Sequence, residues 1–349
     1  MLYLLGDYLQ ELFGPARLLT SHFNLIIIGL TVGFAGVIFL LPRLFKLLPS
    51  DRGREFAIQA ENAIGKPTGA GVVFIPVFLV LAVLVVPLDG KVLLVLLLTF
   101  VAMITGYLDD RSRHPWGELA KGVFDLVLAL GVAFLLYSTE VSTIWLPFTN
   151  ALYETPMWLY VPLATILIWV SINTTNCSDG VDGLSSTLVL IALLSTGTFL
   201  YLVVGHTDFS SYLLLPHYAQ SAKRAITTFT LVGCLAGYLW YNAYPSHVLM
   251  GDAGSRALGF FMGVTIMNTG NPFLILIVCS VILINGGTGL VKVGLLRFFN
   301  IRILHTIRFP LHDHFRKDMN WSNTQVLIRF ALIQMVVTIA LIGITVKVR

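Results

Sequence analysis

The chain has 349 residues, of which 56% are hydrophobic and only 11% are charged. Soluble domains carry roughly 25% charged residues, and a soluble fold of this length has too little interior to bury so much apolar surface. The net charge of +4 comes with no dense basic stripe and no interleaved aromatic platform, so nothing indicates nucleic acid as a partner.

Apolar segments long enough to cross a bilayer recur from one end of the chain to the other. A hydrocarbon core about 30 Å thick takes a helix of about 20 apolar residues. We therefore predict an all-α polytopic membrane protein with about ten transmembrane helices, forming a single domain over residues 1–349. The predicted spans are 23–45, 70–88, 91–108, 119–137, 158–175, 184–204, 225–242, 255–268, 272–298 and 325–346. In the ninth span, Asn285-Gly286-Gly287 predicts a kink.

The distribution of Lys and Arg between the two sets of loops predicts the orientation. Cytoplasmic loops carry an excess of these residues. The loops after spans 1, 3, 5, 7 and 9 hold Arg43, Lys46, Arg52, Arg54, Lys66, Arg111, Arg113, Lys121, Arg256, Arg297, Arg302, Arg308, Arg316 and Lys317. The opposite side holds only Arg17, Lys91, Lys223, Arg224, Lys347 and Arg349. The first set is therefore predicted to be cytoplasmic, with both termini extracytoplasmic.

The first polar motif is Asp109-Asp110, where the third span meets the cytoplasm. Adjacent carboxylates repel one another unless a cation lies near them, and Mg²⁺ usually binds through one or two carboxylates plus substrate phosphates. A solvated helix end flanked by arginines would explain the same pair.

The second motif runs from residue 173 to residue 184 and places two amides and two acids between two apolar spans: Asn173, Asn176, Asp179 and Asp182. Two glycines in it allow tight turns and close approach to a ligand. A structural loop explains one Asp-Gly step, but not this density of acids and amides at a membrane boundary. The motif therefore favours a functional role.

The third motif runs from Asn242 to the Gly-Asp-Ala-Gly-Ser sequence that contains Asp252. The acid lies in a glycine-rich turn just before a span, where it could reach a metal; an ordinary turn and helix cap would look the same in isolation. As the third acidic loop on the cytoplasmic side, it favours function.

The fourth motif contains His312, Asp313 and His314, followed by Arg316 and Lys317. Histidines and bases after a proline suit a diphosphate or a lipid phosphate. Transition-metal binding by the two histidines is a weaker interpretation, and a basic loop attracted to anionic lipid is the non-catalytic one.

Together these motifs supply what phosphoryl transfer needs, which is carboxylates to hold a metal and cations to absorb developing charge. The polar residues gather at one membrane face, whereas a transporter more often has them at the midplane of matched halves. A transporter or flippase, and a silent relative that only binds a lipid carrier, stay as alternatives. Retention of four costly carboxylates argues against the silent one.

The order of these motifs resembles the polyprenyl-phosphate N-acetylhexosamine-1-phosphate transferases. The similarity runs from about Ile64 to Arg349 and comprises Asp-Asp, Asn-x-x-Asn-x-x-Asp-Gly-x-Asp-Gly-Leu, Gly-Asp-x-Gly-Ser and Pro-x-His-x-His. The Trp240-Tyr-Asn242-x-Tyr-Pro segment and the Pro-Leu-His-Asp-His-Phe loop resemble the branch whose donor is UDP-MurNAc-pentapeptide. The chain differs from that branch at His312-Asp313-His314, where three histidines are usual, and in the basic residues after Phe315.

The resemblance implies a Mg²⁺-dependent reaction of UDP-MurNAc-pentapeptide with undecaprenyl phosphate that gives lipid I and UMP, in the bacterial inner membrane. The partners it implies are these two substrates, membrane lipids and a second copy in a homodimer. A UDP-GlcNAc or other UDP-sugar donor is the nearest alternative.

The resemblance also implies residue roles. Asp252 is expected to be the principal Mg²⁺ ligand, with Asp109, Asp110 and Asn176 also at the metal. The expected catalytic residues are Asp109, Asp110, Asp252, His312 and His314, and the expected substrate-binding residues are Asn173, Asn176, Asp179, Asp182, Asn242, Lys66 and Lys121.

Overall fold

The structure is a computed structural model that describes residues 1–51, 53, 63–112, 116–137, 143–146 and 152–347. In chain order its elements are α1 (Leu2–Leu9), η1 (Gly14–Leu19), α2 (His22–Leu44), η2 (Phe45–Leu47), α3 (Gly71–Val85), α4 (Gly90–Arg111), α5 (Glu118–Tyr137), β1 (Thr143–Trp145), β2 (Leu152–Glu154), α6 (Met157–Cys177), α7 (Leu184–Thr198), η5 (Phe199–Val203), α8 (Thr207–Tyr212), α9 (Ser221–Asn242), α10 (Gly251–Met267), η6 (Pro272–Leu274), α11 (Ile275–Val278), α12 (Ser280–Ile282), η7 (Leu283–Gly287), α13 (Thr288–Phe299), α14 (Leu311–Lys317) and α15 (Asn323–Lys347). Four arginines of the predicted charge asymmetry, Arg52, Arg54, Arg113 and Arg349, lie outside the described residues.

Several of these helices are long and apolar enough to cross a membrane. Within the described residues there are seven: His22–Leu47, Gly90–Arg111, Glu118–Tyr137, Met157–Cys177, Leu184–Val203, Ser280–Phe299 and Asn323–Thr345. A shorter apolar helix spans Gly71–Val85. The prediction of a mostly helical, polytopic membrane protein is confirmed.

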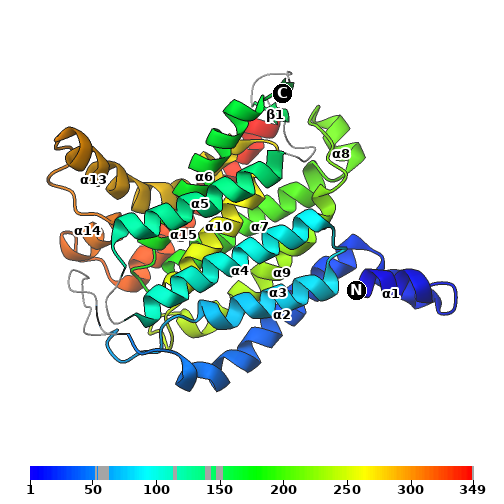
Figure 1. The fold of residues 1–349 in the computed structure, drawn as a ribbon, viewed down its shortest axis with the longest axis horizontal. Helices are drawn as coiled ribbons and strands as arrows, with labels where there is room; N and C mark the ends of the chain where they lie inside the picture. The colour runs from blue at the N-terminus through cyan, green and yellow to red at the C-terminus, as the bar shows by residue number, and fades with distance from the viewer. Residues whose placement is uncertain (52, 54–62, 113–115, 138–142, 147–151, 348–349) are drawn as a thin grey trace.

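Helices α9 and α10 coincide with the other two predicted spans but are not among the seven. Every residue of α10 is buried, and most of α9 is buried too. Helices inside a bundle face other helices in place of lipid, so they tolerate the polar residues that lower their hydropathy. Figure 1 shows α10 (yellow) in the middle of the bundle, with α4, α6 and α7 around it.

Glycines let the start of α3 and the end of α4 approach the start of α10. A Cβ atom at Gly106 would lie 2.3 Å from the backbone oxygen of Asp252, and one at Gly71 would lie 2.3 Å from the backbone nitrogen of Gly254. Small residues allow helix backbones in a membrane to pack closely. These contacts therefore carry the Asp-Asp motif at the end of α4 to the Gly-Asp motif at the start of α10.

The ninth predicted span is irregular at two places. The predicted kink at Asn285-Gly286-Gly287 coincides with the π-helical segment η7. A second break, between α11 and α12 at Cys279, was not predicted. There the Gln334 side chain of α15 donates to the Ile277 oxygen (3.1 Å) and accepts from the Val281 nitrogen (2.9 Å). Broken backbone at membrane depth needs such replacement partners.

A two-stranded sheet is the exception to the all-α prediction. β1 and β2 are antiparallel, with Thr143 opposite Glu154 and Trp145 opposite Leu152. Trp145 is fully buried and its indole donates to the Thr269 oxygen (3.0 Å), so the hairpin covers the end of α10. Strands of three residues are too short to produce an alternating pattern that the sequence reveals.

Candidate active site

The acids of the first and third motifs meet where α4 ends, α5 begins and α10 begins. Asp109 Oδ1 accepts from the Trp116 backbone nitrogen (2.6 Å), and its Oδ2 contacts the Lys121 ammonium. Lys121 Nζ also donates to Asp252 Oδ2 (2.8 Å). We call Asp109, Asp110, Lys121 and Asp252 the acidic cluster. Two carboxylates from distant segments thus converge on one cation.

Asp110 caps the N-terminus of α10. Its Oδ1 accepts from the Asp252 nitrogen (2.9 Å) and its Oδ2 from the Ala253 nitrogen (3.0 Å), which satisfies two backbone donors at the start of the helix. Gly251 has a φ of +66°, and a Cβ atom there would lie 2.4 Å from Asp110 Oδ2. The glycine of the Gly-Asp motif is therefore required both by backbone conformation and by the approach of Asp110.

A second group of polar residues joins the Lys66 loop to the α6–α7 loop. Leu249 N donates to the Pro67 oxygen (2.8 Å), which places Lys66 beside the segment before α10. Lys66 Nζ lies 3.8 Å from Asp182 Oδ2 and donates to Ser246 Oγ (3.1 Å). Asp182 Oδ2 also accepts from the Ser246 nitrogen (3.0 Å). Two expected substrate-binding residues are thus brought together.

Asn242 is buried and its side chain joins three segments. Its Oδ1 accepts from the Gly183 nitrogen (3.0 Å) and the Ser186 hydroxyl (3.1 Å), and its Nδ2 donates to the Val248 oxygen (3.0 Å). It therefore holds the α6–α7 loop against the segment before α10. Asn173 donates to the Trp169 oxygen on its own helix (2.9 Å). Asn176 lies in the last turn of α6 and Asp179 in the loop that follows.

The fourth motif packs against the second through what we call the histidine cluster, which consists of Gly180, Asn285 and His312. Asn285 Oδ1 accepts from the His312 backbone nitrogen (2.9 Å) and lies 3.1 Å from the His312 Nδ1. A backbone nitrogen can only donate, so this amide atom is the oxygen and Nδ1 carries the ring proton. A Cβ atom at Gly180 would lie 2.4 Å from His312 Nε2, so only glycine fits there.

His312 is an uncharged residue in this setting. Burial lowers the pKa of its imidazole to about 3, and the nearby Arg316 acts in the same direction. The side chain is 2% exposed. A neutral, enclosed imidazole orders the loops around it.

Comparison with known proteins finds one family model and several transferases that match this chain. The Glycosyl transferase family 4 model matches residues 92–270. The phospho-N-acetylmuramoyl-pentapeptide-transferase of Treponema pallidum (strain Nichols) is 50% identical over 347 residues, which cover 98% of this chain and 95% of that protein. Its counterpart in Helicobacter pylori (strain HPAG1) is 30% identical over 321 residues, 88% of this chain and 90% of that protein.

The chain belongs to the phospho-N-acetylmuramoyl-pentapeptide-transferase family. It is accordingly a transferase of peptidoglycan biosynthesis and a multi-pass protein of the bacterial inner membrane. The resemblance inferred from the four motifs is confirmed.

The acidic cluster suits the way Mg²⁺ binds in phosphoryl transferases. Within the described residues, no three His, Cys, Asp or Glu side chains come together to hold a metal. Mg²⁺ prefers oxygen ligands and commonly takes only one or two carboxylates, completing its coordination with substrate phosphates and water. The carboxylates of Asp109 and Asp252 already share a cation, the Lys121 ammonium, so they fit such a site.

In the loop where this chain differs from the pattern of the transferase family, the unusual acid is paired with an unusual base. Asp313, at a position where a histidine is usual, accepts from Arg316 (3.4 Å), one of the basic residues after Phe315. Burial raises the pKa of the Asp313 carboxyl, against the opposing effects of Arg316 and Arg308. His314 Nδ1 lies 2.6 Å from Asp318 Oδ2, and the side chain of His314 is partly exposed. The two differences from the family pattern, Asp313 and the basic Arg316, therefore bind each other.

Sequence reasoning missed several residues that shape this transferase's site. Asn285 attracted notice only as part of a kink, although it holds His312. Ser246 and Trp116 act through backbone nitrogens, which no side-chain pattern signals. Asp125 and Arg256 pair between two spans; their spacing of four residues from Lys121 and Asp252 was a signal that could have found them.

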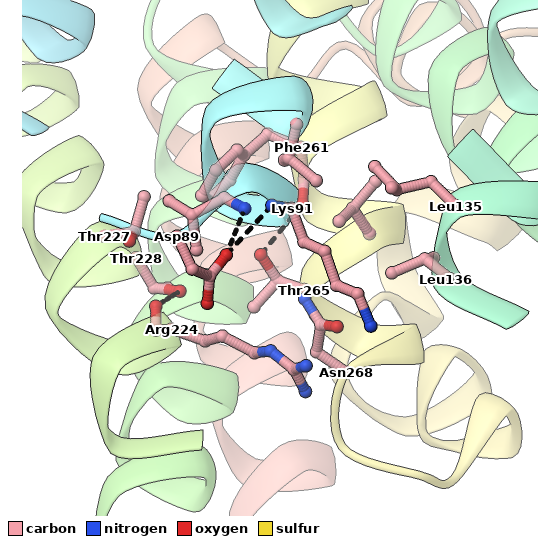
Figure 2. Close-up of a pocket in the computed structure, with 13 residues that line it drawn as sticks. Asp89, Lys91, Leu135, Leu136, Arg224, Thr227, Thr228, Phe261, Thr265 and Asn268 are labelled. Carbon is pink, nitrogen blue, oxygen red and sulfur yellow. Dashed lines mark hydrogen bonds between the residues drawn. The ribbon is translucent and has the colours of Figure 1, made fainter. Parts of the chain in front are cut away.

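A cavity of about 40 Å³ lies elsewhere, between α4, α5, α9 and α10. Figure 2 shows Asp89, Lys91, Arg224 and Asn268 around it. Asp89 caps the first turn of α4 by accepting from the Lys91 and Val92 nitrogens (3.0 and 2.8 Å). The acidic cluster lies at the last turn of this 22-residue helix, roughly 30 Å away along its axis. The cavity is therefore separate from the acidic cluster.

Proposed function

We propose that the chain transfers phospho-MurNAc-pentapeptide from UDP-MurNAc-pentapeptide to undecaprenyl phosphate. A phosphate oxygen of the lipid attacks the β-phosphorus of the donor, a new P–O–P bond forms, and the bond to UMP breaks. UMP leaves with the electron pair of that bond. The observation that carries the proposal is the convergence of Asp109 and Asp252 on one cation, in a chain of this family.

In this proposal the acidic cluster is where the phosphates react. Mg²⁺, held through Asp252 and Asp109, would neutralise charge on the phosphate oxygens. Asp110 holds the first turn of α10 and so fixes the backbone of Asp252. Lys121, whose ammonium lies between Asp109 and Asp252, would supply a positive charge to the departing phosphate.

We assign donor recognition to the neighbouring loops. Asn173, Asn176, Asp179 and Asp182 surround the end of α6 and the start of α7, and Lys66 reaches Asp182. Asn242 and His312 act through the loops they hold, because both side chains are buried and bonded within the protein. His314 is the more exposed histidine and is the one assigned to substrate phosphate.

We further propose that the whole chain, residues 1–349, is one integral membrane domain with ten crossings, both termini extracytoplasmic and the active site cytoplasmic. The seven long helices together with α3, α9 and α10 supply ten segments. In Figure 1, α1 and the red end of α15 lie on the side of the bundle away from α14. The positive charge of the loops favours the α14 side as cytoplasmic. Membrane lipids surround it, and a homodimer stays a prediction of the resemblance.

The test is UMP release by detergent-purified protein with undecaprenyl phosphate, Mg²⁺ and one of two donors. We expect turnover with UDP-MurNAc-pentapeptide, none with UDP-GlcNAc, and complete loss with EDTA that excess Mg²⁺ restores. Turnover only with UDP-GlcNAc would move the chain to the sibling branch of the superfamily. Absence of UMP from both donors, in folded protein, would overturn the proposal.

A further inference from the structure

Directly beneath the acidic cluster lies a second ion pair between the same two helices. Arg256 of α10 donates from Nε (3.0 Å) and Nη2 (2.5 Å) to Asp125 Oδ1 of α5. The two side chains are 1% and 3% exposed. Neither residue belongs to the four motifs that predicted the site, and the carboxylate of Asp125 is fully withdrawn from solvent.

The inner pair repeats the outer one with its signs reversed. Asp125 lies four residues after Lys121 on α5, and Arg256 lies four residues after Asp252 on α10. Residues four apart share a helix face, so the same two faces meet twice, one turn apart. On α5 the order is cation then anion, and on α10 it is anion then cation. Asp125 is also close enough to interact electrostatically with Asp252 and Lys121.

These side chains bridge two helices whose backbones touch little. Helix α5 packs chiefly against α6, where the Trp169 indole donates to the Gly122 oxygen (2.9 Å), whereas α10 packs chiefly against α4 and α6. The Lys121–Asp252 and Asp125–Arg256 ion pairs therefore tie α5 to α10 where the two backbones seldom approach. The fold of α5 on α6 does not depend on them.

Stability alone does not account for such a pair. Replacing a buried ion pair by apolar residues of similar volume is often neutral or stabilising, and charges inside a membrane are costly. The order of acid and cation along each helix has a consequence, however. Without Asp125, the guanidinium of Arg256 can turn to Asp252 on its own helix, and without Arg256, Asp125 can turn to Lys121. Of these two, an acid that precedes its cation by four residues is the better-oriented helical pair.

We propose that Asp125 and Arg256 are positioning residues that tie α5 to α10 and, through their sign order, direct Lys121 onto Asp252 and Asp109 in place of other partners. This rests on the proposed function only in assigning the acidic cluster to a divalent cation. The pair keeps the carboxylate of Asp252 available to that cation by holding Arg256 away from it.

The test is the dissociation constant of Mn²⁺ added without substrates. It is measured from the electron paramagnetic resonance signal of the unbound ion. In Asp125→Asn, Arg256 competes for Asp252, and the dissociation constant is expected to rise about tenfold. In Arg256→Gln, Asp125 takes Lys121 and frees the carboxylates, so the constant is expected to fall about threefold. Ser171→Ala is the matched control: it removes a buried bond to α10 (Ser171 Oγ to the Gly259 oxygen, 2.7 Å) and leaves the constant unchanged. Shifts of the two single variants in the same direction would overturn the proposal.

Each single variant leaves a buried charge, so a double variant guards against loss of folding. Asp125→Leu/Arg256→Leu leaves no unpaired charge and is expected to unfold at the wild-type temperature or above it. Its kcat for UMP release is expected to fall about tenfold, because only Lys121 then bridges the helices. A wild-type kcat in this folded variant would overturn the proposal that Asp125 and Arg256 tie α5 to α10. If wild-type protein releases no UMP, the proposed function fails, while the Mn²⁺ measurement still decides the role of the pair.

Discussion

Asp109 and Asp252 of the acidic cluster and His312 of the histidine cluster were all predicted as catalytic, yet their environments are opposite. Asp109, Lys121 and Asp252 are charged groups that share their bonds, and Lys121 is partly exposed. His312 is enclosed and neutral, with its backbone nitrogen and Nδ1 both directed at Asn285. The first arrangement can exchange a partner for a ligand, and the second holds loops in place. Residues that the sequence assigned to one role therefore lie in surroundings that allow different ones.

The largest expected effect lies in the acidic cluster. Asp252→Asn keeps the shape of the side chain but removes the charge that pairs with Lys121. We expect UMP release to fall roughly 10²- to 10³-fold, as when one preorganised electrostatic group is removed from an active site. The unfolding temperature should change little. More than a tenth of wild-type turnover in this variant would place the chemistry elsewhere.

The histidine cluster should show itself in the pH dependence of stability. The folded pKa of His312, about 3, lies below the unfolded value of 6.5, so the unfolded state takes up the proton first. The contribution of neutral His312 to the unfolding free energy is fully present above pH 6.5. It falls by about 1.4 kcal/mol per pH unit as the pH drops from there toward 3. Thermal unfolding from pH 7 to pH 5 measures this slope.

The raised pKa of Asp313 has the opposite effect on stability, because the folded state then binds the proton more readily than the unfolded state does. His312→Gln retains Asp313 and Arg316, so the difference between the variant and the wild type isolates His312. Equal slopes for the two proteins would contradict a neutral, buried His312.

Gly180→Ala tests how tightly the histidine cluster is packed. The new Cβ atom would lie 2.4 Å from His312 Nε2, and the ring has little room to move because Asn285 holds it. We expect a loss of about 1–3 kcal/mol in unfolding free energy, typical of overpacking. Gly294→Ala in α13 is the control, since nothing lies within 4 Å of a Cβ there, and it should gain up to about 1 kcal/mol. Similar unfolding free energies of the two variants would show that the His312 ring can move to make room for the new methyl group.

The smallest effect is expected at the far end of α4. Asp89→Ala removes a helix cap, which Asp89 forms by accepting from the Lys91 and Val92 nitrogens. The unfolding free energy should fall by about 1 kcal/mol, while UMP release stays at the wild-type level. This acid on the same helix as Asp109 is thereby a matched control for the acidic cluster, and a large loss of turnover would show that the two ends are coupled.

Much of the molecule follows from local properties of the sequence. Apolar segments of bilayer length predicted the membrane helices, because each span must satisfy its own backbone and face an apolar environment. The ninth span was expected to be irregular at Asn285-Gly286-Gly287 because glycines permit it, and η7 begins two residues before this sequence. The motifs identified the family because their order and spacing are specific as a set.

Only the tertiary structure decided which polar residues meet. Asp110 follows Asp109 directly, yet Asp110 caps α10 while Asp109 contacts Lys121. Nothing local distinguishes two adjacent carboxylates: Asp109 binds Trp116 and Lys121 shortly after it in the chain, whereas the partners of Asp110 lie more than 100 residues away. The Asp125–Arg256 pair and the bonds of Gln334 were missed for the same reason, since a buried polar group is satisfied by whatever the packing of helices brings to it. The sequence determined the membrane setting and the family, and helix packing determined the partners of each charge.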